Sequence, residues 1–236
     1  YLGTTHHVHE YTPEQVLEAL PHVIYGLESF DPALVRSAIP TYFVSRLARR
    51  YVKVVLSGEG ADELFAGYHY LKKFDSSEDL DLELRQITAN LHNTNLQRVD
   101  RLTMLNSLEG RVPFLDVELV DYAFRISPDL KLYEASDPGR GRPESIETPA
   151  ASEPRERDAR PPEACEAGGS GKAIAVEKWI LRKAVEDYLP PDIVWRTKEK
   201  FAIGTGTAEV LQDYAEDRIG DDEFEELKRI AREQGL

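Results

Sequence analysis

The spacing of apolar and polar residues predicts a strand, two helices and a second strand in the first 56 positions. Residues 3–12 alternate enough to form a strand. A threonine and proline at 12–13 predict a helix to about residue 27, and an aspartate and proline at 31–32 predict a second helix to about residue 50. Pro40 lies inside the second helix and should kink or divide it. Residues 52–56 are apolar and rich in valine, which is typical of a buried strand.

This order of strand, helix, helix and strand predicts an α/β fold with a parallel sheet flanked by helices. In such folds the ligand crevice lies beyond the carboxyl ends of the strands. From residue 61 onward the spacing is mostly helical, with helices expected over 80–91, 96–108 and 118–126. Pro113 should end one element and Asp116 should cap the next. We therefore expect an all-helical cap and a mostly helical C-terminal part.

Length, composition and charge exclude several classes of protein. The 236 residues, 41% of them hydrophobic, are enough for one sizeable domain with its own core. No apolar run approaches the roughly 18 residues that span a bilayer, and the first residues do not resemble a signal peptide, so no membrane contact is expected. The net charge of −14 argues against nucleic acids and membrane surfaces, because both are polyanions. One cysteine excludes an intrachain disulfide framework and suits the cytoplasm.

A glycine-rich turn with three carboxylates follows the second predicted strand. Residues 56–68 read LSGEGADELFAGY. The two glycines permit positive φ and close approach to a ligand, and a helix starting at about residue 61 would aim free N–H groups at an anion. The carboxylates would repel a phosphate unless a cation intervenes, and Mg²⁺, which takes oxygen ligands, is the natural bridge. Plain helix capping explains the same pattern equally well.

Two further motifs give this turn a more specific meaning. EGRVPFLD occupies 109–116, and EKWILR at 177–182 precedes WRTKEKF at 195–201. Together with SGEGADELFAGY at 57–68, they resemble the synthetase domain of glutamine-hydrolysing asparagine synthetases, whose motifs are SGEG-S-DE-x-x-x-GY and E-x-RVPFLD. The resemblance spans roughly residues 1–133 and 172–206.

The resemblance implies a fold, a domain division and a reaction. The fold is adenine nucleotide alpha hydrolase-like, of the N-type ATP pyrophosphatase kind. Residues 1–133 would form a partial synthetase domain and 172–236 its C-terminal helical part. The reaction is an ATP-dependent, AMP-forming amide ligation that uses ATP and Mg²⁺. It converts aspartate to asparagine through a β-aspartyl adenylate, with ammonia supplied from glutamine.

Two other functions stay open. A β-lactam synthetase or peptide-cyclising relative would use the same adenylation with an internal amine as nucleophile. A catalytically silent synthetase-like subunit would keep the fold without the reaction.

The resemblance also implies roles for individual residues. Asp62 is expected to bind Mg²⁺ and pyrophosphate, and Glu59 to orient or deprotonate the incoming ammonia. Lys198 would stabilise the polyphosphate during adenylation, with Lys200 as a local rival. The adenylate is expected to contact the turn at Ser57, Gly58 and Gly60.

Charged residues around the second motif are expected to support the site. They lie among apolar neighbours and so need partners, which predicts a buried ionic network behind the site. The members of the predicted network are Arg98, Asp100, Glu109, Arg111 and Asp116.

The sequence departs from the resembled family in two ways. No Ser-Gly-Gly-x-Asp-Ser pyrophosphate loop occurs, and no glutaminase domain with a cysteine nucleophile precedes the motifs. The single cysteine, Cys165, lies in a polar, proline-rich stretch. We therefore expect the chain alone to be incomplete, as a fragment or a split subunit, with a partner chain supplying the pyrophosphate loop. A homodimer stays open.

Three remaining segments have simple interpretations. Residues 134–171 hold six prolines, five glycines and no aromatic residue, which predicts a disordered insertion acting as a passive linker or as a gate. Acidic helices over 208–219 and 221–232 should form a solvated surface. His6, His7 and His9 alternate as in a strand, which argues against a metal cluster.

Overall fold

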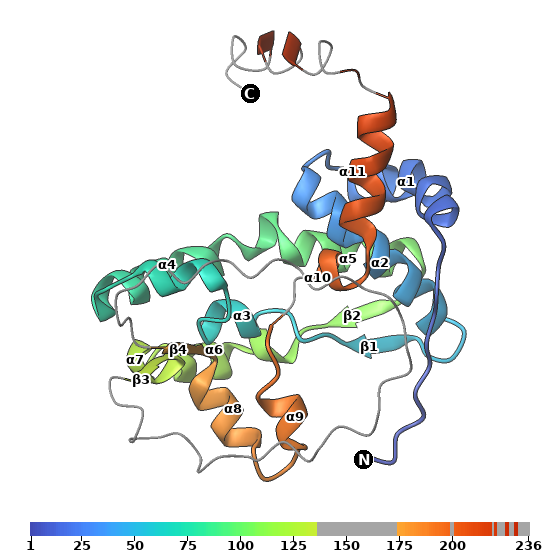
Figure 1. Ribbon diagram of the computed structural model, residues 1–236. Coiled ribbons are helices and arrows are strands. Elements are labelled where there is room, and N and C mark those ends of the chain that lie inside the picture. Colours follow the sequence, from blue (N-terminus) through green and yellow to red (C-terminus); the bar gives the residue numbers. More distant parts are fainter. Residues whose placement is uncertain (136–173, 199–200, 219, 221–224, 227–228, 231–236) are drawn as a thin grey trace, which may run out of the picture.

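The computed structural model describes residues 1–135, 174–198, 201–218, 220, 225–226 and 229–230. Within them helices predominate, and two short pairs of strands lie among the helices (Figure 1). No helix in this described part is long and apolar enough to cross a bilayer.

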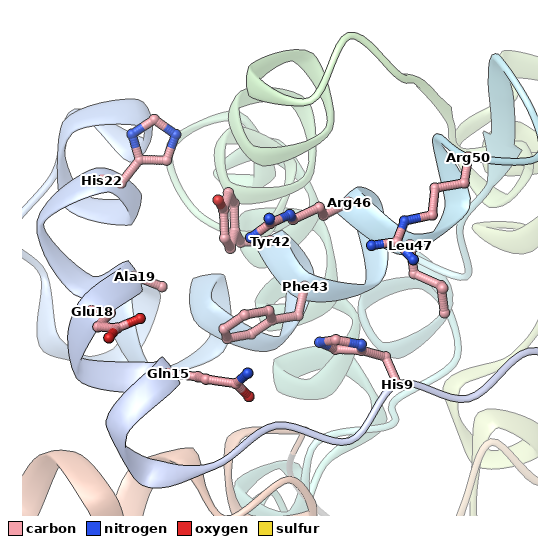
Figure 2. A pocket seen from close by; sticks show the side chains of 10 residues that line it. All are labelled: His9, Gln15, Glu18, Ala19, His22, Tyr42, Phe43, Arg46, Leu47 and Arg50. Atoms are coloured by element: carbon pink, nitrogen blue, oxygen red, sulfur yellow. The ribbon is translucent and has the colours of Figure 1, made fainter.

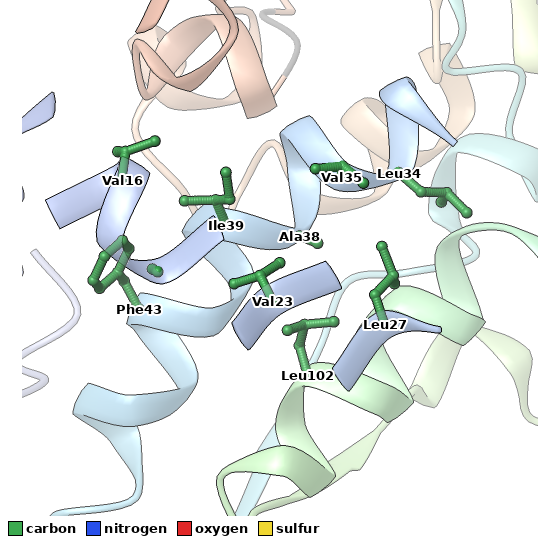
Figure 3. Close-up of a cluster of buried hydrophobic side chains, with 10 residues drawn as sticks. Val16, Val23, Leu27, Leu34, Val35, Ala38, Ile39, Phe43 and Leu102 are labelled. Atoms are coloured by element: carbon green, nitrogen blue, oxygen red, sulfur yellow. The ribbon is translucent and has the colours of Figure 1, made fainter. Parts of the chain in front are cut away.

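Three helices form the main hydrophobic core. They are α1 (Pro13–Leu27), α2 (Pro32–Ala48) and α5 (Asn95–Leu105). Figure 3 shows the aliphatic side chains that meet where the three helices cross, among them Val23, Ile39 and Leu102, all fully buried. Burial of these side chains holds α5 against the N-terminal helix pair, and α5 also supplies residues to the candidate site.

The predicted starts of the first two helices are confirmed. Thr12 accepts a hydrogen bond from the Gln15 backbone N–H, and the Gln15 side chain accepts from the Thr12 backbone N–H, which completes a capping box. Asp31 caps α2 by accepting hydrogen bonds from the Ala33 and Leu34 backbone N–H groups. Pro40 does not divide α2, because it is buried with Ile39 in the core and this packing outweighs the missing backbone hydrogen bond.

A short parallel sheet leads into the glycine-rich turn. β1 (Val54–Leu56) lies within the predicted strand, and it pairs with β2 (Glu109–Arg111) in the register Val55 to Gly110. The prediction that this strand is buried is wrong, because Val54 is 37% and Leu56 is 74% exposed. The predicted strand over 3–12 is wrong, because these residues adopt no regular secondary structure. Its alternating aromatic residues make ring contacts instead, with His7 stacked on Tyr51 at 4.0 Å. Sequence spacing had not indicated β2.

The segment after the turn is mixed rather than all helical, which corrects the expected cap. The predicted helices are found as α4 (Ser77–Ala89), α5 and α6 (Val117–Ala123). They are accompanied by β2 and by an antiparallel pair formed by β3 (Leu132–Ala135) and β4 (Ile174–Glu177). The other elements are α3 (Ala61–Leu64), α7 (Pro128–Lys131), α8 (Trp179–Val185), α9 (Pro191–Val194), α10 (Phe201–Gly204), α11 (Thr207–Arg218) and the 3-10 turns His69–Lys73, Leu91–Asn93 and Pro113–Leu115.

The β3–β4 pair brings the C-terminal segment back to the turn. Its register places Leu132 opposite Glu177, and the Tyr133 ring stacks on Trp179 at 4.8 Å. The predicted insertion lies outside the described residues except for residues 134 and 135, which belong to β3. Of the two acidic C-terminal helices, the first is α11, and most of the second also lies outside the described residues.

Candidate functional site

The turn after β1 needs a glycine at position 60. The Ser57 N–H donates to the Arg111 carbonyl at 2.8 Å, which extends the sheet by one bond before the chain turns. Gly60 has φ of +95°, and a Cβ there would lie 2.5 Å from Leu115 Cδ2. α3 then begins at Ala61 but has only four residues, so its dipole is small and an anion near the turn would need cationic side chains.

Two lysines supply this positive charge beside Asp62. Lys178 Nζ lies 2.7 Å and Lys198 Nζ 2.6 Å from the same carboxylate oxygen, Asp62 Oδ1. Lys198 also donates to the Gly67 carbonyl at 2.8 Å. Burial alone would raise the pKa of Asp62, but the two ammonium groups outweigh burial and hold this pKa below its ordinary value. Asp62 is therefore a carboxylate with two cations, and the cluster carries one net positive charge.

The backbone places Lys178 with little freedom. Lys178 follows β4 directly, adopts a left-handed conformation with φ of +54°, and donates its N–H to the Phe65 carbonyl at 3.1 Å. A Cβ on Gly67 would lie 2.9 Å from Asp62 Cα and closer still to the Lys178 side chain. Sequence reasoning missed Lys178, although the EKWILR motif contains it, because nothing local to the motif points toward Asp62.

Glu59 is engaged by an arginine from α5. The Arg98 guanidinium donates to Glu59 Oε1, and both side chains are largely buried. Burial raises the pKa of Glu59; Arg98 opposes this rise, and the nearby Glu63 and Asp62 charges add to it. The structure thus places Glu59 in the turn as predicted, while its role toward ammonia stays a prediction.

The third acidic residue of the segment, Glu63 on α3, is hydrogen-bonded to two polar side chains. The Tyr68 hydroxyl donates to Glu63 Oε1, and Asn95 Nδ2 donates to the same oxygen at 3.2 Å. Asn95 also donates to the Tyr68 hydroxyl oxygen at 2.8 Å. The Tyr68 ring lies beneath Lys198, with Nζ 4.5 Å from the ring centroid.

Comparison with known proteins decides the family. The family model described as asparagine synthase matches residues 1–86 and 72–235. The chain belongs to the asparagine synthase family. It is 37% identical over 235 residues to a probable glutamine-hydrolysing asparagine synthetase of Schizosaccharomyces pombe, covering 95% of this chain and 35% of that protein.

Other members of the asparagine synthase family match over the same extent. The chain is 34% identical to glutamine-hydrolysing asparagine synthetase 1 of Saccharomyces cerevisiae, covering 95% of this chain and 35% of that protein. It is 32% identical to asparagine synthetase B of Escherichia coli, with 95% and 34% covered. The chain thus spans about a third of the length of these relatives.

The buried ionic network predicted from the sequence does not form. Of its five residues only Arg98 is buried, and Arg98 pairs with Glu59. Glu109 and Arg111 form an exposed pair at 2.7 Å, because positions two apart on β2 face the same, solvated side. Asp116 is exposed and caps α6, and Asp100 is exposed on α5.

Of the remaining predicted site residues of the turn, Ser57 and Gly58 are accessible and Gly60 is buried. Ser57 is half-buried, and Gly58 is exposed with open space where a Cβ would stand. Their contacts with an adenylate stay predictions, and Lys200 lies outside the described residues.

The acidic residues of the turn fit Mg²⁺ through a single protein ligand. No group of three or more histidine, cysteine or acidic side chains is placed to hold a metal ion in the part of the chain that the structure describes. Asp62 is ionised and its side chain is 30% exposed, so it can offer one carboxylate. Proteins that bind Mg²⁺ with a nucleotide use one or two carboxylates together with phosphate oxygens, and Asp62 meets that requirement.

A cavity elsewhere in the molecule contains none of the predicted site residues. It has a volume of about 470 Å³ and lies between His9, α1 and α2 (Figure 2). The side chains of Tyr42 and Arg46 line its α2 side. The candidate site is therefore assigned from the motif residues and their contacts and not from this cavity.

Proposed function

We propose that this chain carries part of an ATP-dependent, AMP-forming amidoligase site that makes asparagine from aspartate, ATP and ammonia. The proposal rests on one observation above all: Lys178 and Lys198 converge on Asp62 at the turn that follows a parallel strand. Membership of the asparagine synthase family and the names of the relatives support it.

The reaction has two steps. An aspartate carboxylate oxygen attacks the α-phosphorus of ATP, pyrophosphate leaves, and a β-aspartyl adenylate forms. The nitrogen of ammonia then attacks the acyl carbon, AMP leaves, and the nitrogen gives up a proton. The protein must therefore stabilise phosphate charge in the first step and accept or relay a proton in the second.

Lys178 and Lys198 suit the first step. Each presents an ammonium group that can donate to phosphate oxygens, and Asp62 holds both groups in place before the nucleotide binds. Asp62 would hold Mg²⁺, which would supply further positive charge to the phosphates. The two lysines together lessen the charge that develops on the leaving group.

Glu59 suits the second step. Its pKa is raised, first by burial, which makes its carboxylate a better proton acceptor than an exposed glutamate. Arg98 fixes one carboxylate oxygen, so we assign the contact with ammonia to the other. Ser57, Gly58 and Gly60 would line the adenylate on the same turn.

The wider assignment follows the family. We propose an adenine nucleotide alpha hydrolase-like fold for the complete synthetase domain and the cytoplasm as its location. A glutaminase domain would supply ammonia, and a partner chain or an additional segment would carry the pyrophosphate loop. A homodimer is compatible with this arrangement.

The names of the relatives do not favour the β-lactam synthetase or peptide-cyclising alternative. An activity assay distinguishes a catalytically silent subunit from an enzyme. The chain would be mixed with ATP, Mg²⁺, aspartate and ammonium, alone and with a partner carrying a pyrophosphate loop, while asparagine and AMP are measured.

We expect asparagine to form when the partner is present. Asp62→Asn should abolish it, because a neutral amide removes the negative charge that Lys178 and Lys198 share. Loss of a helix cap would not explain this result, since α3 is capped by Gly60 without a side-chain hydrogen bond. No asparagine with any such partner would overturn the enzymatic assignment, and pyrophosphate exchange that depends on another acid would overturn aspartate as the substrate.

A further inference from the structure

Tyr68 forms a platform under the ammonium group of Lys198. The Lys198 Nζ atom lies 4.5 Å from the centroid of the Tyr68 ring, within the range of a cation–π contact. The same Nζ donates to Asp62 Oδ1 at 2.6 Å and to the Gly67 carbonyl at 2.8 Å. Asp62, Gly67 and Tyr68 therefore contact the Lys198 ammonium group together, and we call these three residues the Lys198 seat.

The ring of Tyr68 is itself held from two elements. Its hydroxyl donates to Glu63 Oε1 on α3, and it accepts from Asn95 Nδ2, the first residue of α5, at 2.8 Å. Asn95 closes the triangle by donating to Glu63 at 3.2 Å. Burial, reinforced by the Glu63 charge, raises the pKa of Tyr68 far above its ordinary value, so the hydroxyl keeps its proton and stays a donor.

A buried glutamate at position 63 lowers the stability of the fold, so its presence needs a reason, and its contact with Tyr68 offers one. Glu63 as a whole is 2% exposed, and its second carboxylate oxygen, Oε2, has no hydrogen-bond partner among the described residues. A buried oxygen without a donor lowers stability, and an apolar side chain would avoid that cost. The other oxygen, Oε1, receives both Tyr68 and Asn95, which indicates that holding the ring is what the carboxylate does.

We infer that Tyr68, fixed by Glu63 and Asn95, is a positioning residue that orders the Lys198 ammonium for phosphate binding. The positioning part stands on the contacts alone, and the phosphate part rests on the proposed function. The contacts around Tyr68 join three distant segments of the chain. Asp62 and Glu63 lie on α3, Asn95 begins α5, and Lys198 follows α9. A positioning role explains why the Tyr68 hydroxyl is held by two part-buried hydrogen bonds.

The matched control lies two residues away. The Tyr70 hydroxyl also donates to a glutamate, Glu83 Oε1, at 2.7 Å, and its ring also faces a lysine, with Lys73 Nζ 5.3 Å from the centroid. Tyr70 is 42% exposed and has no contact with Lys198 among the described residues. The Tyr70 ring stacks on the Tyr68 ring, with the centroids 6.0 Å apart. The same substitution at Tyr70 therefore removes a ring beside Tyr68 while Tyr68 and its hydrogen bonds to Glu63 and Asn95 remain.

The experiment observes the lysine ammonium groups directly. Nitrogen-15 NMR of side-chain NH₃⁺ groups reports ordered, slowly exchanging lysines, and the Lys198 signal is assigned by its loss in Lys198→Arg. Tyr68→Leu should broaden or remove this signal, Tyr68→Phe should weaken it, and Tyr70→Leu should leave it unchanged. Glu63→Gln keeps a carbonyl acceptor for both donors and should retain the signal, whereas Asn95→Leu should weaken it.

Titration with inorganic pyrophosphate and Mg²⁺ then separates the two levels of the inference. Pyrophosphate should shift the Lys198 signal in the wild type, and Tyr68→Leu, which removes the cation–π contact, should weaken pyrophosphate binding by about three- to tenfold. A Lys198 signal that is equally sharp in wild type, Tyr68→Leu and Tyr68→Phe would overturn the positioning role and leave the proposed function standing. A Lys198 signal that depends on Tyr68 but ignores pyrophosphate in the wild type would uphold the positioning role and overturn the phosphate role of Lys198.

Discussion

Gly67 offers a sharp test of the geometry around Asp62. A methyl group added at this position would lie 2.9 Å from the backbone Cα of Asp62, a separation that real Cβ atoms essentially never show, and closer still to Asp62 Oδ1 and the Lys178 chain. The two side chains could rotate away, but Asp62 Cα cannot. The Gly67 N–H also donates to the Asp62 carbonyl at 2.8 Å, so the two backbones are held together.

Gly67→Ala should therefore shift the backbone of the turn and lower stability. Overpacking of this kind typically costs about 1–3 kcal/mol, which corresponds to a fall in Tm of roughly 2–12 °C for a chain of this length. The lysine pair should loosen as well, because Lys198 donates to the Gly67 carbonyl. Urea unfolding monitored by circular dichroism gives the free energy, and a thermal scan gives the Tm.

Gly58→Ala is the control, since open space surrounds the Cβ position there and the glycine lies in the same turn. The control should change the unfolding free energy by less than about 0.5 kcal/mol. Equal stabilities for Gly67→Ala and Gly58→Ala would refute the close approach of residues 62 and 67.

Three further predictions concern charged groups. The folded-state pKa of Asp62 is lowered, so the carboxylate stabilises the fold above its unfolded pKa near 4, and this contribution is lost as the pH falls through the folded pKa. Asp62→Asn should therefore be less stable than wild type at pH 6 in urea unfolding. A difference in unfolding free energy that fails to narrow by pH 3 would contradict this. Burial lowers the pKa of Lys131 to about 8, and Arg85 adds to this shift while Asp81 opposes it. The folded state therefore binds fewer protons than the unfolded state, so wild-type stability should rise between about pH 8 and about pH 10 relative to Lys131→Met. Parallel plots of unfolding free energy against pH for the two proteins would exclude the buried ammonium. Arg98→Met leaves Glu59 buried without its cation and should lower the unfolding free energy by on the order of 3 kcal/mol. Much of this stability should be recovered when Glu59→Gln is added. A double variant no more stable than Arg98→Met would refute the pairing.

Sequence reasoning succeeded where the signal is local. The capping pairs at the starts of α1 and α2 act within three residues, and both were found as predicted. The glycine at position 60 was expected to allow positive φ, and it has φ of +95°. The helices α4, α5 and α6 were located to within about three residues because their apolar spacing is regular.

Sequence reasoning failed where a partner from another segment decides the outcome. Residues 3–12 alternate like a strand, but a strand needs a neighbour, and none of the described residues pairs with them. β2 is only three residues long and contains a glycine and two charged residues, so it carried no strand signal until β1 lay beside it. The predicted ionic network failed for the same reason, because the register of β2 turned Glu109 and Arg111 toward solvent.

The sequence by itself determined the chemistry of the turn: its glycines, its acidic residues and the motifs that place it in the asparagine synthase family. Only the tertiary structure decided which cations serve Asp62. Lys178 and Lys198 lie more than a hundred residues from it along the chain, and their Nζ atoms meet one carboxylate oxygen because β3 and β4 pair and return that segment to the turn. Local rules reach about one helical turn, whereas an ion pair forms wherever folding brings opposite charges within a few ångströms.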